Sequence, residues 1–205
     1  PTTGVLEAQL YDPASNSFKS ASTMAYPRVY HSNTLLLPDA TVLALGGNPL
    51  RTVYEAHMEI YSPPYLFKSN GTPAKRPVIS QVSPQSIGYG ASFQIQTHDA
   101  ADIKSVVLVR AGAVTHAFDM EQRLVGVTFH KQQGVLQAKA PANGNLAPPG
   151  YYLLFILNEQ GVPSVARFVH LGKTGGDDGG DHGHGNGDGH GNGHGNGKGE
   201  HKDLR

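Results

Sequence analysis

The chain has 205 residues, with 16 basic and 16 acidic side chains and a formal net charge of zero. This balance gives no electrostatic basis for binding nucleic acid or an anionic membrane. The length allows one or two domains, and no apolar run approaches the roughly 18–20 residues of a membrane span. Because cysteine is absent, the sequence contains no disulfide framework and no indication of redox compartment.

Short apolar runs rich in β-branched and aromatic residues follow one another along the chain, separated by glycine and proline. Helical periodicity is nearly absent, so the pattern predicts an all-β fold with turns at regular spacing. The clearest predicted strands are residues 34–37, 41–45, 92–95, 106–109, 125–129 and 151–157.

The first 64 residues contain an internal repeat. Leu-Tyr-Asp-Pro at 10–13 recurs as Ile-Tyr-Ser-Pro at 60–63, and Gly46-Gly47 between them permits a tight turn at positive φ. A period near 50 with a double glycine is the signature of a Kelch β-propeller blade. One and a half blades cannot bury their faces, and a closed propeller has roughly four to eight blades. Residues 1–64 are therefore predicted to be the end of a propeller whose other blades lie upstream.

Two further segments follow the repeat. Residues 65–77, which contain Ser-Asn-Gly-Thr-Pro and Arg-Pro, are predicted to be a linker. Residues 78–172 contain about eight strand candidates, which fits an immunoglobulin-like sandwich with enough core to fold alone. The Cys-Trp-Cys pattern of antibody domains is absent from it.

Residues 173–205 are rich in glycine, histidine and aspartate and contain no aromatic residue. With so little apolar surface to bury, this tail is predicted to be disordered. Its Gly-Asn-Gly-Asp rhythm is similar to calcium-binding repeats, but it lacks the aliphatic residue that each such repeat needs. Weak binding of Cu, Ni or Zn by its histidines, and a solvated tail without a ligand, are the other two interpretations.

One tyrosine and two histidines are candidate metal ligands. Tyr30 and His31 come shortly after Pro27, and His116 lies in Val-Thr-His-Ala-Phe-Asp-Met-Glu-Gln-Arg at 114–123. Two imidazoles and a phenol suit a Cu(II) centre with nitrogen and oxygen donors. Neighbours in a regular strand face opposite ways, so Tyr30 and His31 must lie in a loop or strand start to share a metal. The alternative is a Tyr-His pair packed at a blade edge and a hydrogen-bonded core histidine.

Eight stretches together carry a resemblance to a known family. They are Arg-Val-Tyr-His-Ser (28–32), Leu-Leu-Leu-Pro-Asp (35–39), Leu-Gly-Gly-Asn-Pro (45–49), Glu-Ile-Tyr-Ser-Pro-Pro-Tyr-Leu (59–66), Val-Leu-Val-Arg (107–110), the 114–123 stretch, Ala-Pro-Pro-Gly-Tyr-Tyr (147–152) and Gly-Val-Pro-Ser (161–164). In this order and spacing, residues 28–171 resemble the C-terminal part of the galactose oxidase and glyoxal oxidase family of copper radical oxidases. The glyoxal oxidase branch and its bacterial relatives look closer to this sequence than galactose oxidase itself. Arg110, Asp119 and Arg123 are predicted to be ion-pair or turn residues rather than catalytic ones.

The resemblance implies a Kelch propeller that carries copper near its axis and an immunoglobulin-like domain that sends a loop to the metal. It implies that Tyr30 is the axial tyrosine that takes the substrate's hydroxyl proton. It also implies that His31 and His116 are the copper imidazoles, each with its second ring nitrogen held by an acceptor. The fourth ligand, a tyrosine bonded to a cysteine that forms the radical, is expected upstream, since nothing in this chain matches it.

The resulting expectation is the C-terminal portion of an extracellular or cell-surface copper oxidase. It would oxidise aldehydes or primary alcohols with O₂ and release H₂O₂. Its partners would be the small-molecule substrate, O₂ and the upstream blades, and this chain alone is expected to be inactive without the radical-forming half. The alternative is a non-catalytic Kelch and immunoglobulin-like module that binds carbohydrate or protein and keeps relic ligand positions.

Overall fold

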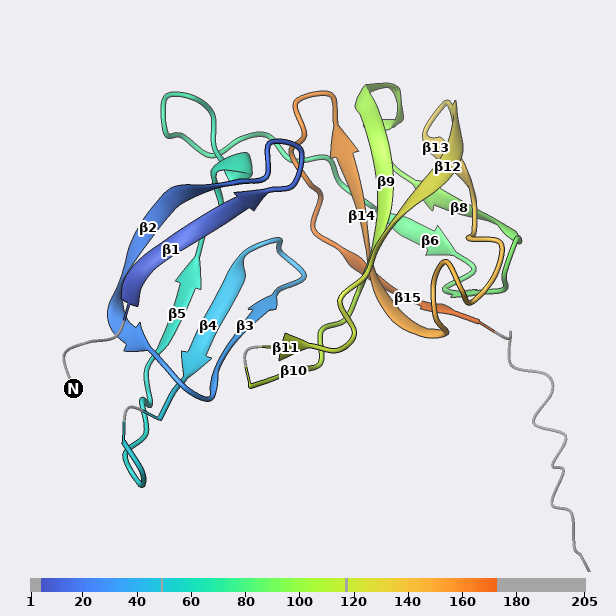
Figure 1. Ribbon diagram of the computed structural model, residues 1–205. Helices are drawn as coiled ribbons and strands as arrows, with labels where there is room; N and C mark the ends of the chain where they lie inside the picture. The colour runs from blue at the N-terminus through green and yellow to red at the C-terminus, as the bar shows by residue number, and fades with distance from the viewer. Residues whose placement is uncertain (1–4, 49, 117, 173–205) are drawn as a thin grey trace, which may run out of the picture.

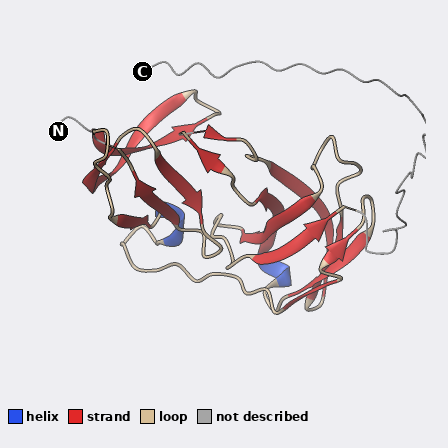
Figure 2. Cartoon of the chain, turned by 90° about the horizontal axis from the view of Figure 1, so that it is seen from below, coloured by secondary structure: helices blue, strands red, loops and turns tan. Residues whose placement is uncertain are grey.

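The computed structural model describes residues 5–48, 50–116 and 118–172. The predicted disordered tail, residues 173–205, lies outside them. In the described residues strands dominate, and the helical segments are two three-residue 3₁₀ turns, η1 (Pro64–Leu66) and η2 (Ala100–Asp102) (Figure 2). No helix in these ranges is long and apolar enough to cross a membrane. The predicted all-β class is confirmed.

The N-terminal part forms two small antiparallel sheets (Figure 1). The first pairs β1 (Val5–Asp12) with β2 (Ser17–Arg28), and the second contains β3 (Ser32–Leu36), β4 (Val42–Gly46) and β5 (Met58–Tyr61) in sequence order. The two copies of the repeated motif end β1 and β5, where proline cannot continue the strand ladder. Successive antiparallel strands are the arrangement within a propeller blade. The assignment of this part to a Kelch propeller stays a prediction.

The C-terminal part is a sandwich whose strands run in the order β6-β8-β13-β12-β9-β14-β15-β7. The sheet turns a corner at β12, because residues 128–132 pair with β13 whereas residues 124–127 pair with β9. The predicted immunoglobulin-like sandwich is confirmed. Its strands are β6 (Gln81–Ser83), β7 (Ser86–Ile87), β8 (Ser92–Gln96), β9 (Ile103–Arg110), β12 (Leu124–Gln132), β13 (Val135–Lys139), β14 (Gly150–Asn158) and β15 (Arg167–Leu171).

Strand β14 lies between two apolar clusters. Tyr152, Leu154 and Ile156 are fully buried in the core between the sandwich layers. The alternating residues Leu153 and Phe155 are also buried, in a second cluster on the outer face that includes residues of the N-terminal part. A strand buried on both faces needs apolar residues at every position, which explains the continuous apolar run at 151–157.

Residues 65–77, the predicted linker, contain no named strand and join the two parts. Arg76 in this segment makes three hydrogen bonds to backbone oxygens. Its Nη1 donates to Asp39 O at 2.7 Å in the N-terminal part. Its Nε and Nη2 donate to Pro163 O at 2.8 Å and Ser164 O at 2.6 Å in the sandwich. One side chain therefore fastens the N-terminal part to the sandwich.

Candidate metal centre

The first two candidate ligands lie in a tight turn between β2 and β3. The N–H of Ser32 donates to Val29 O at 3.0 Å and closes the turn around Tyr30 and His31. His31 has φ +66°, far from the strand conformation. The strand rule that puts neighbours on opposite faces does not apply in a turn. The prediction that this pair lies in a loop or strand start is confirmed.

The double glycine at the end of β4 lets the chain pass close to this turn. Gly46 has φ +72° and Gly47 has φ +130°. A Cβ at Gly46 would lie 3.0 Å from the backbone oxygen of His31, so a side chain there would push the turn away. The next residue, Asn48, donates its N–H to Tyr30 O at 2.6 Å. The Gly-Gly-Asn sequence thus lies against the backbone of both Tyr30 and His31.

The third candidate ligand lies at the tip of a short hairpin that leaves the sandwich after β9. Its strands are β10 (Val114–Thr115) and β11 (Phe118–Asp119), in which Thr115 pairs with Phe118. His116 therefore occupies the first position of a two-residue connection, and its φ of +52° is typical of such hairpins. The hairpin extends toward the N-terminal strands, and β10 contacts β3 (Figure 1).

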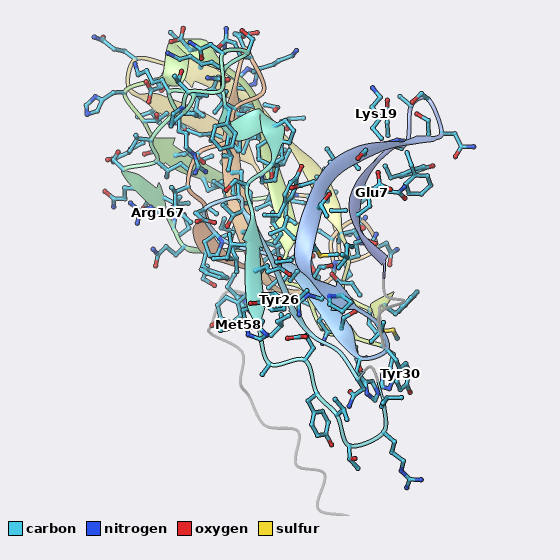
Figure 3. The ribbon with its side chains drawn as sticks, turned by 90° about the vertical axis from the view of Figure 1, so that its left-hand side faces the viewer. Glu7, Lys19, Tyr26, Tyr30, Met58 and Arg167 are labelled. Atoms are coloured by element: carbon cyan, nitrogen blue, oxygen red, sulfur yellow. The ribbon has the colours of Figure 1, made fainter. Side chains whose placement is uncertain are left out.

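The turn and the hairpin bring together all three predicted ligands, although His31 and His116 are 85 residues apart in sequence. The Nε2 atoms of His31 and His116 are 2.9 Å apart. The ring centre of Tyr30 lies 3.8 Å from that of His31 and 5.6 Å from that of His116. Tyr30 is 63% exposed, and Figure 3 shows it at the end of the molecule away from Lys19. The cluster is therefore open to a substrate or to another part of a protein.

The second nitrogen of each imidazole has a hydrogen-bond partner. His31 Nδ1 lies 2.9 Å from Asn48 Oδ1. An amide oxygen only accepts, so His31 Nδ1 carries the proton and Nε2 keeps a lone pair. His116 Nδ1 lies 2.7 Å from Thr115 Oγ1, which can accept its proton in the same way. Metal-binding histidines typically have such outer partners, which fix the tautomer and ring orientation.

The distance between the two nitrogens tests which metal geometry fits. Two nitrogens about 2.0 Å from one ion are about 2.8 Å apart at a right angle and about 3.3 Å apart at the tetrahedral angle. The observed 2.9 Å between His31 Nε2 and His116 Nε2 fits the right angle. Tetragonal sites with nitrogen and oxygen donors are typical of Cu(II) or Ni(II). In the described part of the chain no three His, Cys, Asp or Glu side chains gather into a metal site, and the candidate centre itself has two histidines and a tyrosine.

Both histidines hold an uncommon backbone conformation. Five non-glycine residues have positive φ in the described ranges, and His31 and His116 are two of them. Each such residue costs about 1–3 kcal/mol and persists only where the surrounding structure imposes it, which is common at functional sites. The two histidines with this conformation are the two whose Nε2 atoms lie 2.9 Å apart.

Two residues of this cluster, Asn48 and Thr115, were missed by sequence reasoning. Neither belongs to a sequence pattern that indicates a hydrogen-bond partner for a metal-binding histidine. Both do lie in stretches that carry the family resemblance, and Thr115 directly precedes a candidate ligand. A polar residue close to each candidate histidine within those stretches is the signal that could have found them.

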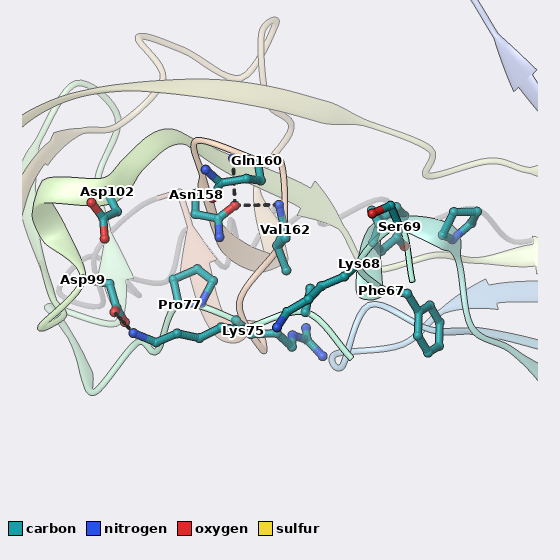
Figure 4. Close-up of a pocket in the computed structure, with 14 residues that line it drawn as sticks. Phe67, Lys68, Ser69, Lys75, Pro77, Asp99, Asp102, Asn158, Gln160 and Val162 are labelled. Atoms are coloured by element: carbon teal, nitrogen blue, oxygen red, sulfur yellow. Dashed lines mark hydrogen bonds and ion pairs between the residues drawn. The ribbon is translucent and has the colours of Figure 1, made fainter. Parts of the chain in front are cut away.

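An open hollow of about 720 Å³ lies elsewhere, between the linker and the sandwich (Figure 4). Several of its polar side chains have partners within the chain. Lys75 Nζ lies 3.9 Å from Asp99 Oδ1, and Asn158 Oδ1 accepts the N–H groups of Gln160 and Val162 at 3.1 and 2.9 Å. None of the three predicted ligands lines this hollow, so it is separate from the candidate metal centre.

Residues 76–171 match the family of galactose oxidase-like early set domains. The chain is 35% identical over 173 residues to a galactose oxidase of Gibberella zeae, covering 83% of this chain and 25% of that protein. It is 35% identical over 175 residues to the aldehyde oxidase GLOX of Vitis pseudoreticulata, covering 78% of this chain and 33% of that protein. It also resembles the solved structure of a fungal alcohol oxidase of the AA5 family in complex with copper. That match has a TM-score of 0.77 and 36% identity, and covers 84% of this chain and 37% of the other. The chain thus spans a quarter to a third of these curated relatives.

Proposed function

Because this chain belongs to the galactose oxidase and glyoxal oxidase family, we propose that it is the C-terminal part of a copper radical oxidase. The enzyme would oxidise aldehydes or primary alcohols with O₂ and release H₂O₂. One observation carries the proposal: His31 Nε2 and His116 Nε2 meet at 2.9 Å, against the ring of Tyr30. The copper in the AA5 alcohol oxidase structure supports the same metal here.

In this proposal Tyr30, His31 and His116 are the copper ligands contributed by the chain. Copper, when bound, supplies one of the two one-electron acceptors that alcohol oxidation needs, and the other is a tyrosyl radical on a Cys–Tyr pair expected upstream. A primary alcohol loses two electrons and two protons to become an aldehyde, and O₂ gains them to become H₂O₂. An aldehyde reacts as its hydrate and leaves as a carboxylic acid.

The phenol oxygen of Tyr30 takes the proton of the substrate's hydroxyl group as general base. Coordination of a phenol to a cation makes the phenolate accessible near neutral pH. The exposed ring of Tyr30 leaves room for a substrate beside the imidazoles. Asn48 and Thr115 hold the Nδ1 sides of His31 and His116, so both Nε2 lone pairs face the same point.

The proposal also assigns the parts of the chain. Residues 1–64 end a Kelch propeller, 65–77 link it to the sandwich at 78–172, and 173–205 form a tail. Upstream blades of the same protein are the proposed partner of the N-terminal sheets. Exposed apolar residues there support it, since Leu10, Phe18, Met58 and Ile60 are 41, 65, 68 and 62% exposed. The protein would act outside the cell or at its surface.

A copper titration of this chain is the first test. Cu(II) bound at the candidate site should give an electron paramagnetic resonance signal with nitrogen coupling, and His116→Ala should remove the component that the site contributes. His130→Ala is the control, because His130 is an exposed histidine of β12 outside the site. All variants keep the tail histidines, so any difference between them belongs to the site. An unchanged signal in His116→Ala would contradict the ligand assignment.

Peroxide release tests the reaction in the longer protein. The copper-loaded, oxidant-activated protein should form H₂O₂ from glyoxal, methylglyoxal, glycolaldehyde or galactose, and His116→Ala should abolish it. Copper binding without peroxide from any of these substrates would instead support the non-catalytic module.

A further inference from the structure

Three of the stretches that carry the family resemblance lie in the sandwich and its hairpin. His116 is the one proposed copper ligand among them. The three stretches are 107–110 at the end of β9, 114–123 in the hairpin and its return, and 147–152 before and within β14. In the structure all three meet at the guanidinium group of Arg110. That side chain is 17% exposed, so its charge depends on protein partners rather than on water.

Arg110 connects the hairpin to the sandwich. Its Nε donates to the carboxylate of Glu121, just after β11. Its Nη1 donates to Pro148 O at 2.9 Å and Pro149 O at 2.8 Å, in the segment that leads into β14. Hydrogen bonds to a charged group are stronger than neutral ones, and one planar guanidinium can serve several acceptors at once.

The segment before β14 is shaped to receive this guanidinium. Gly150 has φ +136°, and a Cβ there would lie 3.2 Å from Arg110 Nη1. The guanidinium lies over the Tyr152 ring, with Arg110 Cζ 5.6 Å from the ring centre. The Pro-Pro-Gly-Tyr-Tyr sequence therefore supplies two carbonyl acceptors, an open space and an aromatic face for one side chain, and Pro148 O also accepts the Tyr152 hydroxyl at 2.7 Å.

The hairpin side of the contact is rigid. Asp119 Oδ1 accepts the N–H of Ala113 at 3.1 Å and of Glu121 at 3.0 Å. The backbone N–H of Arg110 donates to Arg123 O at 2.9 Å and closes the base of the loop. The position of the Glu121 carboxylate is thus linked to that of β11, which ends three residues after His116.

We propose that Arg110 is a positioning residue for His116: by fastening the hairpin base to the sandwich, it fixes where His116 Nε2 lies relative to His31. This inference rests on the proposed copper site and adds a residue that does not touch the metal. The hairpin has only two residue pairs, and so short a hairpin is marginal on its own. A metal site needs its ligands held within about 0.5 Å, so an outside clamp is required.

The test uses the metal-free chain first, in two-dimensional NMR. The unmutated chain should give a cross-peak between the His31 and His116 ring protons, and Arg110→Gln should abolish it while sandwich signals stay dispersed. Glu121→Gln cuts only the hairpin side of the contact and should also abolish it, which guards against a folding defect at Arg110. Arg110→Lys should restore it only in part, because one ammonium cannot serve the carboxylate and both carbonyls.

Arg167→Gln is the matched control, because Arg167 also donates to a backbone oxygen, Ile79 O at 3.0 Å, but lies outside the hairpin. It should leave the cross-peak intact. Copper affinity should then fall about tenfold in Arg110→Gln and not in Arg167→Gln. If Arg110→Gln changes neither the cross-peak nor the copper affinity, the positioning role of Arg110 is wrong and the copper proposal stands. A chain that binds no copper while its cross-peak still depends on Arg110 would overturn the copper proposal and leave the positioning role standing.

Discussion

At position 46 the absence of a side chain matters for two separate reasons. The backbone there has φ +72°, which L-residues rarely adopt, and a Cβ would lie 3.0 Å from the backbone oxygen of His31. The first reason affects stability alone, whereas the second also moves a candidate ligand. Gly134, in the turn between β12 and β13, separates the two effects, because it has φ +75° with nothing within 4 Å of its Cβ position.

Gly46→Ala and Gly134→Ala should therefore have similar effects on stability but different effects on the candidate site. Both should lower the free energy of unfolding by about 1–2 kcal/mol for the left-handed conformation. Only Gly46→Ala should shift the NMR signals of the His31 ring and weaken copper binding by at least several-fold. Equal effects of both variants on copper affinity would mean that the close approach at position 46 does not hold His31.

At the scale of elements, one ion pair ties the strands beneath the Tyr30–His31 turn. Arg28, the last residue of β2, has its Nη2 2.8 Å from Glu59 Oε2 in β5. Its Nη1 donates to Gly46 O at 3.1 Å and His57 O at 3.0 Å. Glu59 also accepts the N–H of Ala25 at 2.7 Å. β2, β4 and β5 are thereby joined at the point where the chain enters the turn.

The pH dependence of stability should reveal this pair. The hydrogen bond from the Ala25 N–H, with the Arg28 guanidinium, holds the pKa of Glu59 below its ordinary value of 4.5, although burial opposes the shift. Since the folded pKa is the lower one, the stabilisation is complete above 4.5 and is lost as pH falls through the folded pKa.

Glu59→Gln should lower the free energy of unfolding at neutral pH by about 1–3 kcal/mol, because Arg28 loses its counter-charge. The difference from the unmutated chain should shrink as pH falls from 4.5 through the lowered pKa of Glu59, where Glu59 itself becomes protonated. Denaturant unfolding across pH measures this. Glu159→Gln is the control, since Glu159 is 54% exposed and lies 3.8 Å from Lys131 at the surface. A difference between Glu59→Gln and the unmutated chain that does not change with pH would contradict the assignment.

At the scale of the whole molecule, the two histidines come from different parts of the chain, so the contact between the parts sets their separation. The apolar cluster on the outer face of β14 contains residues of both parts. Arg76 adds three hydrogen bonds that reach both parts.

Arg76→Ala should lower the free energy of unfolding by about 2–3 kcal/mol, because three backbone acceptors, two of them in half-buried hydrogen bonds, lose a charged donor. It should also weaken the cross-peak between the His31 and His116 rings, although Arg76 belongs to neither the turn nor the hairpin. Urea unfolding and NMR of Arg76→Ala and Arg76→Lys measure both effects. Lysine retains the charge but not the three-way geometry, so it should recover only part of the loss. If Arg76→Ala destabilises the chain without affecting the cross-peak, the contact serves stability and not the site.

Local pattern was enough to predict the long strands of the sandwich, but not β1 and β2. Residues 106–109, 125–129 and 151–157 lie within β9, β12 and β14, because apolar runs bounded by glycine and proline can bury themselves only as strands in a chain without helical periodicity. The two-residue strands β7, β10 and β11 are too short to show a period. They form because the folded chain places pairing partners beside them, so a local stretch of sequence does not predict them.

The candidate ligands divide in the same way. Residue types and the family resemblance were sufficient to single out Tyr30, His31 and His116, and strand geometry was sufficient to require a turn at the first two. The ion pair of Arg110 was predicted, but its partners and the roles of Asn48 and Thr115 were not predictable, because each depends on an angle or distance between segments that lie far apart or fold back locally. A sequence determines which donors and acceptors exist and which backbone conformations they tolerate. Only the tertiary structure decides which of them meet, since a hydrogen bond or a metal bond requires atoms within about 3 Å.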